Sequence, residues 1–325
     1  MHLILNCAGA RGLTSSDMHS SHLRGAGRGG PLTRLLLLVG VGILSAQASE
    51  LRSGVDTFLR LGYEPIALRR TSENHLFLFG RVNGRRRSCL VDTGWSFTTM
   101  QADKSLPTSR LEILKLGRTT FTNEPARAEK VLFNGQPASF DVVLGLDFLR
   151  RNFAVLDCGS RRLFTRQVAL SDEAQRDLDD TLRRAGFREI GLQLKTPPAL
   201  TLAARVNGEP VEMLLDSGAV WSCVDERQCA RLKLKPMPST ARITGAGATG
   251  RRSVAVADVK SLRLGEVDLK DNMLALFDLA DWGFAAPGKA LSEVQGILGG
   301  DLLAATSAVI DCQRLKLWLK PTARK

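Results

Sequence analysis

Two aspartates draw attention because each follows an apolar run and precedes a hydroxyl residue and a glycine. Asp92 lies in Leu90–Gly94 (LVDTG), and Asp216 lies in Leu214–Gly218 (LLDSG). A buried carboxylate is costly unless it is paired or used in chemistry. Two carboxylates about 3 Å apart cannot both ionise easily, so they share a proton and titrate as one unit. Such a pair can activate a water for attack on a peptide carbonyl and protonate the leaving amine.

The residues that follow each aspartate have the properties needed to hold such a pair in place. Gly94 and Gly218 allow the backbone to turn sharply and to approach closely. The hydroxyl groups of Thr93 and Ser217 are expected to form hydrogen bonds across the axis between the two aspartates, which would keep both loops rigid.

The two aspartates are separated by 124 residues, and a second motif repeats at the same spacing. RVNG occurs at Arg81–Gly84 and again at Arg205–Gly208. LKLG at Leu114–Gly117 corresponds to LRLG at Leu262–Gly265, now 148 residues apart, and LGLDFL at Leu144–Leu149 corresponds to LGGDLL at Leu298–Leu303, 154 residues apart. The second copy therefore contains insertions of 24 and then 6 residues. A repeat of this kind predicts two equivalent units. Duplication also explains how two like carboxylates can meet on a pseudo-twofold axis.

Each copy shows the same expected order of elements. Apolar strands at 76–82 and 200–206 precede Asn-Gly turns, and apolar segments at 154–166 and 308–320 are expected to close the copies as hairpins. The prediction is a mostly β protein with short helices, formed by two pseudo-symmetric β-barrel lobes with the active site at their interface. The predicted divisions are 1–48 (signal peptide or N-terminal extension), 49–165 (first lobe), 166–185 (linker helix) and 186–325 (second lobe).

Three helix starts are predicted from capping residues. Ser171 is expected to cap the linker helix, which would end at Gly186. Asp147 and Asp301 follow the repeated glycine turns and are expected to be the N-caps of two short helices.

The larger insertion of the second copy contains a glycine-rich run that invites two interpretations. A dinucleotide-binding fingerprint must open a helix, but the sequence that follows, SVAVADV, alternates like a strand. A glycine-tipped β-hairpin that serves as a flap is therefore favoured. The flap residues are Gly245, Ala246, Gly247, Ala248, Thr249 and Gly250.

The N-terminus has the features of a targeting segment. Arg34 precedes a run of roughly ten apolar residues, followed by small residues at Ala46 and Ala48. Export to the periplasm or the extracellular space is expected, and an uncleaved segment would be the only membrane contact. The cysteines after this segment, Cys89, Cys158, Cys223, Cys229 and Cys312, are odd in number and show no C-x-x-C spacing, so no disulfide pairing is predicted.

Composition excludes several classes of function. Only His75 remains after the targeting segment, which argues against Ser-His-Asp catalysis and against a histidine-rich metal site. The formal net charge of +12 is carried by scattered Lys and Arg, and only one Tyr is present. A basic surface exposed to solvent is favoured over a nucleic-acid-binding surface. No metal or cofactor is expected.

These motifs resemble those of the retropepsin-like and pepsin-like aspartic proteases over most of residues 56–320. The resemblance rests on Asp-Thr/Ser-Gly at 92–94 and 216–218 and on Leu-Gly at 144–145 and 298–299. It implies that Asp92 and Asp216 form a catalytic dyad in an endopeptidase of the tandem, single-chain form seen in some bacterial proteins. The implied substrate is a peptide or an unfolded protein. The implied state is a monomer, with a homodimer as the alternative.

The sequence departs from the family pattern at Trp95. A small residue usually follows the motif, as Ala219 does in the second copy, and both positions are candidates for contact with substrate. The indole of Trp95 would either crowd the floor of the substrate site or fill a pocket. Two alternatives follow: a pseudoprotease that binds extended peptides without cutting them, and a protease active only as a dimer through its second lobe. The first copy also lacks the flap insertion.

Overall fold

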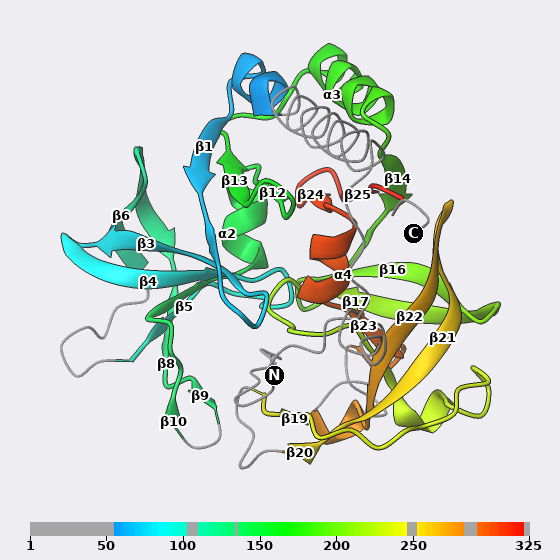
Figure 1. Ribbon diagram of the computed structural model, residues 1–325. Helices are drawn as coiled ribbons and strands as arrows, with labels where there is room; N and C mark the ends of the chain where they lie inside the picture. The colour runs from blue at the N-terminus through cyan, green and yellow to red at the C-terminus, as the bar shows by residue number, and fades with distance from the viewer. Residues whose placement is uncertain (1–54, 103–109, 134–135, 246–251, 283–290, 322–325) are drawn as a thin grey trace, which may run out of the picture.

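The computed structural model describes residues 55–102, 110–133, 136–245, 252–282 and 291–321. Two β-rich lobes lie on either side of a central sheet, and helix α3 (Asp172–Arg184) packs above that sheet (Figure 1). The mostly β, two-lobed architecture predicted from the sequence is confirmed. The predicted N-terminal segment, 1–48, lies outside the described residues.

The first lobe is built on one eight-stranded sheet in the order β7-β6-β3-β4-β11-β5-β8, with β2 beside β3. Within it, β4 and β11 are parallel, while β3 and β4 form the hairpin expected around the Asn-Gly turn. A small hairpin, β9–β10, lies apart from this sheet. The strands are β2 (Arg69–Arg70), β3 (Leu76–Val82), β4 (Arg85–Val91), β5 (Thr99–Gln101), β6 (Arg110–Leu116), β7 (Thr119–Pro125), β8 (Arg127–Glu129), β9 (Leu132–Phe133), β10 (Gln136–Pro137) and β11 (Val142–Leu144).

The second lobe repeats this plan in the order β15-β16-β17-β23-β18-β22-β21. Here β17 and β23 are parallel, as β4 and β11 are in the first lobe. An additional pairing between β16 and β21 curls the sheet back on itself. The strands are β15 (Gln193–Lys195), β16 (Ala199–Val206), β17 (Glu209–Leu215), β18 (Cys223–Asp225), β19 (Arg242–Ile243), β20 (Arg252–Ser253), β21 (Ala255–Leu264), β22 (Val267–Phe277) and β23 (Gly296–Leu298).

A six-stranded sheet in the order β1-β13-β12-β24-β25-β14 joins the lobes. The predicted closing hairpins, β12–β13 and β24–β25, are both present, and they meet through antiparallel pairing of β12 with β24. The two copies thus share one sheet, which the sequence did not indicate. The strands are β1 (Glu64–Ala67), β12 (Val155–Asp157), β13 (Arg162–Thr165), β14 (Arg188–Gly191), β24 (Val309–Asp311) and β25 (Lys316–Leu319).

The register of this sheet bears on the pseudo-equivalent cysteines. Val155 is opposite Asp311 and Asp157 is opposite Val309, so Cys158 and Cys312 lie at opposite ends of the β12–β24 pairing. Four residues of strand separate them along the sheet, on the order of 13 Å, whereas a disulfide needs Cα atoms within about 7 Å. The five cysteines in the described part of the chain are free and buried.

The helices are short except for α3. The Ser171 hydroxyl accepts a hydrogen bond from the Ala174 N–H at 3.3 Å, so the predicted N-cap of α3 is confirmed, and Gly186 follows the helix with φ of +87°. No helix in the described ranges is long and apolar enough to cross a membrane. The other helical segments are 55–60, α2 (Leu146–Arg151), α4 (Gly300–Ala305), η1 (Glu226–Gln228) and η2 (Ala280–Trp282).

The prediction that Asp147 and Asp301 are N-caps is wrong. The capping positions are Gly145 and Gly299, and each aspartate is the second residue of its helix. From there its carboxylate faces the loop that follows the Asp-Thr/Ser-Gly motif. Asp147 accepts hydrogen bonds from the N–H and hydroxyl of Thr98, at 2.6 and 2.8 Å.

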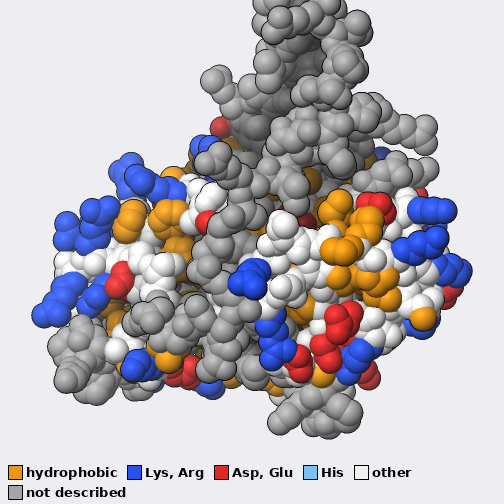
Figure 2. Space-filling view, turned by 60° about the horizontal axis from the view of Figure 1, so that its bottom comes forward, with side chains coloured by type: hydrophobic (Ala, Val, Ile, Leu, Met, Phe, Trp, Pro, Cys, Tyr) orange, Lys and Arg blue, Asp and Glu red, His pale blue; other side chains and the backbone are white. Residues whose placement is uncertain are grey.

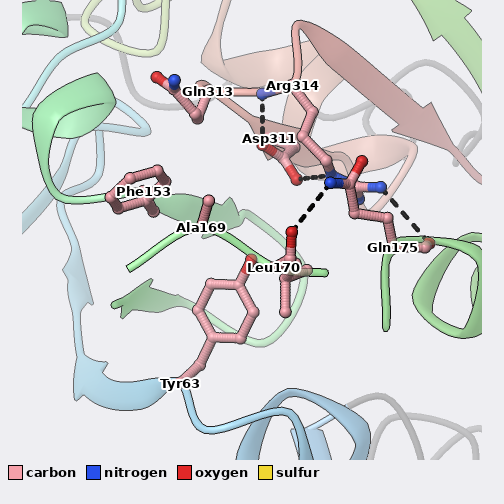
Figure 3. Close-up of a pocket in the computed structure, with 8 residues that line it drawn as sticks. All are labelled: Tyr63, Phe153, Ala169, Leu170, Gln175, Asp311, Gln313 and Arg314. Carbon is pink, nitrogen blue, oxygen red and sulfur yellow. Dashed lines mark hydrogen bonds and ion pairs between the residues drawn. The ribbon is translucent and has the colours of Figure 1, made fainter. Parts of the chain in front are cut away.

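A buried ionic cluster attaches α3 to the joining sheet. Arg314 lies between Asp311 and Asp179, with distances of 2.6 and 2.7 Å to their carboxylates, and all three side chains are almost fully buried. Figure 3 shows Arg314 beside Asp311 and Gln175, at the edge of a pocket into which Tyr63 projects. Charges taken out of water must be paired, so this cluster fixes the linker helix against the strands β24 and β25 of the second copy.

Candidate active site

The two aspartates occupy equivalent ends of parallel strand pairs. Asp92 follows β4, and its N–H donates to the carbonyl oxygen of Leu144 in β11 at 3.1 Å. Asp216 follows β17, and its N–H donates to Leu298 of β23 at 3.0 Å. Both side chains are fully buried, with 0% exposure.

The glycines show how closely the two loops approach each other. A Cβ atom added to Gly94 would lie 2.5 Å from both carboxylate oxygens of Asp216. A Cβ atom added to Gly218 would lie within 2.7 Å of the Asp92 carboxyl group. Real Cβ contacts are longer than this, so only glycine lets each loop contact the opposite carboxyl group. The structure thus brings the four predicted residues together between the lobes.

One oxygen of each carboxyl group is held by backbone donors. Oδ1 of Asp92 accepts from the Gly94 N–H at 2.8 Å, and Oδ1 of Asp216 accepts from the N–H groups of Gly218 and Ala219 at 2.8 and 3.0 Å. The two Oδ2 atoms are buried and have no donor among the described residues. A proton shared between the two carboxyl groups would satisfy them.

The electrostatics agree with a shared proton. Burial raises the pKa of Asp92 above the usual range for an aspartic acid, because the charged form loses its hydration. Burial likewise raises the pKa of Asp216, and the adjacent charge of Asp92 raises it further. Once the first proton has left, the remaining proton is therefore shared by the pair, and it leaves only at a higher pH.

Thr93 and Ser217 form a symmetric set of hydrogen bonds between the loops. The Thr93 N–H donates to the Ser217 hydroxyl at 3.0 Å, and the Ser217 N–H donates to the Thr93 hydroxyl at 2.9 Å. The two hydroxyls donate onward, each at 3.0 Å, to the carbonyl oxygens of Leu215 and Val91 respectively. Four hydrogen bonds thus fix the two strand ends that carry the aspartates.

Trp95 points into the first lobe. Its side chain is 3% exposed and packs in a small apolar cluster with Leu90 and Val143, while its Nε1 donates to the Thr99 hydroxyl at 2.8 Å. Of the two possibilities raised by the sequence, the indole fills a pocket of its own lobe. Ala219, its counterpart in the second copy, is also fully buried.

The predicted flap is described only at its base. Strands β19 and β20 pair with Arg242 opposite Ser253, and Gly245 is buried where the described chain stops. The remaining predicted flap residues, Ala246, Gly247, Ala248, Thr249 and Gly250, lie outside the described residues.

A second pair of loop-holding contacts was missed by sequence reasoning. Asp301 accepts from the N–H and hydroxyl of Ser222 at 2.8 and 2.7 Å, as Asp147 does from Thr98. Thr98 and Ser222 are separated by 124 residues, the same spacing as the two catalytic candidates. The repeat spacing could therefore have indicated that Thr98 and Ser222 have equivalent roles, but interpreting Asp147 and Asp301 as N-caps left these loops without a partner.

Part of the chain matches a known protein family. Residues 202–302 match the family model described as "Aspartyl protease". Similar solved structures include an aspartic proteinase from Irpex lacteus, with 12% identity over 81% of this chain and 98% of that chain and a TM-score of 0.49. Another is a retropepsin-like aspartic protease from Rickettsia conorii, with 18% identity over 41% and 90% of the two chains and a TM-score of 0.28. No curated protein gives a significant match.

The family match confirms the resemblance to the aspartic proteases that the sequence indicated. It also confirms the predicted class of activity, a peptide hydrolase of the aspartic type.

Proposed function

We propose that the chain is a single-chain aspartic endopeptidase in which Asp92 and Asp216 form the catalytic dyad. The observation that carries this proposal is the pair of buried carboxyl groups whose Oδ2 atoms lack donors among the described residues. Buried acidic groups with raised pKa values lower the stability of the fold at neutral pH, and such groups are found mainly at functional sites.

The geometry supports a division of labour between the two carboxyl groups. With one proton shared by the pair, the ionised group removes a proton from a water as that water attacks the peptide carbonyl. The protonated group donates a hydrogen bond to the developing oxyanion and then passes its proton to the leaving amine. The backbone donors on the Oδ1 atoms and the hydrogen bonds between Thr93 and Ser217 hold both groups in position.

The test is cleavage of a peptide library by the wild type, Asp92→Asn and Asp216→Asn. Each variant keeps the shape of the side chain but removes an ionisable group, so kcat/KM should fall by about a thousandfold or more. Asp157→Asn is the matched control, since Asp157 is a buried aspartate bonded to Ser160 outside the dyad. Full activity of either dyad variant would overturn the proposal.

The joining sheet favours a monomer over a dimer formed through two second lobes. Strand β12 of the first copy pairs with β24 of the second, and Thr93 bonds to Ser217 of the same chain. Activity is expected to elute with the monomer in size-exclusion chromatography. Activity confined to a dimer would support the alternative.

The proposal extends to a flap, to substrates and to export. Strands β19 and β20 form the base of a hairpin that would close over an extended peptide or unfolded segment.

The apolar run after Arg34 and the small residues at Ala46 and Ala48 support export. Mass spectrometry of the N-terminus of the mature protein tests export, and an intact N-terminus in the cytoplasm would contradict it.

A further inference from the structure

A groove of about 710 Å³ opens in the second lobe between strand β21 and the segment that follows η1. Lys233, Lys235 and Lys260 line it, together with Asp258 and the apolar side chain of Met237. No dyad residue lines it, so the groove is separate from the site proposed above.

The groove carries an excess of positive charge. Lys233 pairs with Glu209 at 2.9 Å. The exposed side chains of Lys235 and Lys260 have no ion-pair partner among the described residues, and they outnumber the one acidic side chain, Asp258. On the face of the molecule drawn in Figure 2, Lys and Arg side chains are spread over both flanks instead of forming one patch. The groove is distinguished by being hollow as well as basic.

The side chain of Asn207 links the two walls of the groove. Asn207 donates to the carbonyl oxygen of Leu232 at 3.0 Å, and its own carbonyl oxygen accepts from the N–H groups of Lys260 and Ser261 at 3.0 and 3.3 Å. These backbone donors are therefore already used and cannot cradle a phosphate. Volumes of about 300–1,000 Å³ suit ligands much larger than a single phosphate.

The groove belongs to the second copy. One wall comes from its larger insertion, and the other comes from β21. At the positions of Lys260 and Ser261, the first copy has Glu112 and Ile113, and Ile113 is 52% exposed. The equivalent strand of the first lobe thus presents an acidic and an apolar side chain instead.

We propose that this groove binds an acidic polypeptide segment that also carries an apolar side chain. Carboxylates of the segment would pair with Lys235 and Lys260, while its apolar residue would contact Met237. A peptide suits the groove better than a small anion because the cations are flexible side chains and the groove of about 710 Å³ is much larger than a phosphate.

The groove borders the bridge from which the hairpin of β19 and β20 extends. Met237 and Val256 exchange backbone hydrogen bonds of 2.8 and 3.0 Å, and from this bridge the chain leads on to β19 and β20. A segment bound beside Met237 would therefore lie against the root of that hairpin.

The test is fluorescence anisotropy of a short peptide rich in Glu with two Leu residues and a neutral dye, added to the full chain. Lys235→Glu/Lys260→Glu should raise Kd about tenfold or more, since two attractive contacts become repulsive. The matched control is Lys115→Glu/Lys130→Glu, which makes the same change in net charge at exposed positions of the first lobe. The control should change Kd by less than about twofold.

Three outcomes would overturn the proposal. The first is equal binding by the groove variant and the control variant. The second is displacement of the peptide by low millimolar inorganic phosphate at constant ionic strength, which would indicate a small-anion site. The third is binding of anionic phospholipid vesicles without binding of the peptide, which would indicate a membrane contact. Because no outcome depends on peptide cleavage, failure here is distinguishable from failure of the proposed protease activity.

Discussion

Thr93 and Ser217 exchange hydrogen bonds across the interface of the two lobes, the backbone N–H of each donating to the side-chain hydroxyl oxygen of the other. Their side chains are buried, so no water can replace a lost partner. This relationship connects the stability of the two-lobed fold to the position of the dyad, because the same loops carry Asp92 and Asp216.

Thr93→Val should therefore destabilise the protein by about 2–4 kcal/mol, because it leaves the Ser217 N–H and the Leu215 carbonyl without their partner. Thr93→Ser keeps the hydroxyl and should retain most of the stability. Thr120→Val, at an exposed position of β7, is the control and should change stability by less than about 0.5 kcal/mol. Urea denaturation gives the comparison. Equal effects of the two valine variants would contradict the assigned hydrogen bonds.

Gly94→Ala should be much more damaging than Gly191→Ala. The new Cβ atom at position 94 would overlap the Asp216 carboxyl group, so we expect a loss of about 1–3 kcal/mol and of cleavage. At Gly191 in β14 nothing lies within 4 Å of the added atom, so alanine should be neutral or slightly stabilising. Thermal denaturation and peptide cleavage measure both effects. Full activity of Gly94→Ala would show that the loops lie farther apart.

The repeat in the sequence predicted which site residues lie together, but the sequence did not predict the sheet that joins the copies or the role of Asp147. The constant spacing of the repeat was enough to pair Asp92 with Asp216 and Thr93 with Ser217. The pairing of β12 with β24 could not be predicted, because both are short apolar strands and nothing in such a strand specifies its partner. Asp147 was misread because an acidic residue at a helix start can accept from its own helix or from a neighbouring loop. Only the three-dimensional position of Thr98 decides between them.

The ionic cluster under α3 should contribute much more than an exposed ion pair on the same helix. Arg314→Leu leaves Asp311 and Asp179 buried without this cation, so a loss of about 3–5 kcal/mol is expected. Arg60→Leu removes an exposed ion pair between residues 55–60 and α3 and should cost less than about 1 kcal/mol. Chemical denaturation of both variants tests this. Losses of similar size would show that the cluster is not coupled to folding.

The dyad should make the wild type less stable as the pH rises. Burial raises the folded-state pKa of both aspartates above the unfolded value, so the folded state binds protons more tightly. This contribution is complete below the unfolded pKa of about 4 and is lost as the pH rises through the folded pKa values. The double variant Asp92→Asn/Asp216→Asn should lose this dependence, whereas Asp258→Asn should keep it. Parallel stability profiles of the wild type and the double variant between about pH 4 and pH 8 would refute the raised pKa values.

Variants of Trp95 test whether the protein is an active protease or a pseudoprotease. Because the indole packs against Leu90 and Val143, Trp95→Phe should preserve cleavage and cost about 1 kcal/mol for the lost bond to Thr99. Trp95→Ala should open a cavity and cost about 3–5 kcal/mol without raising kcat/KM per folded molecule. Trp221→Phe, at a half-buried tryptophan near the second motif, is the control for replacing an indole. A rise in kcat/KM on Trp95→Ala would mean that the indole obstructs the substrate, and would favour the pseudoprotease.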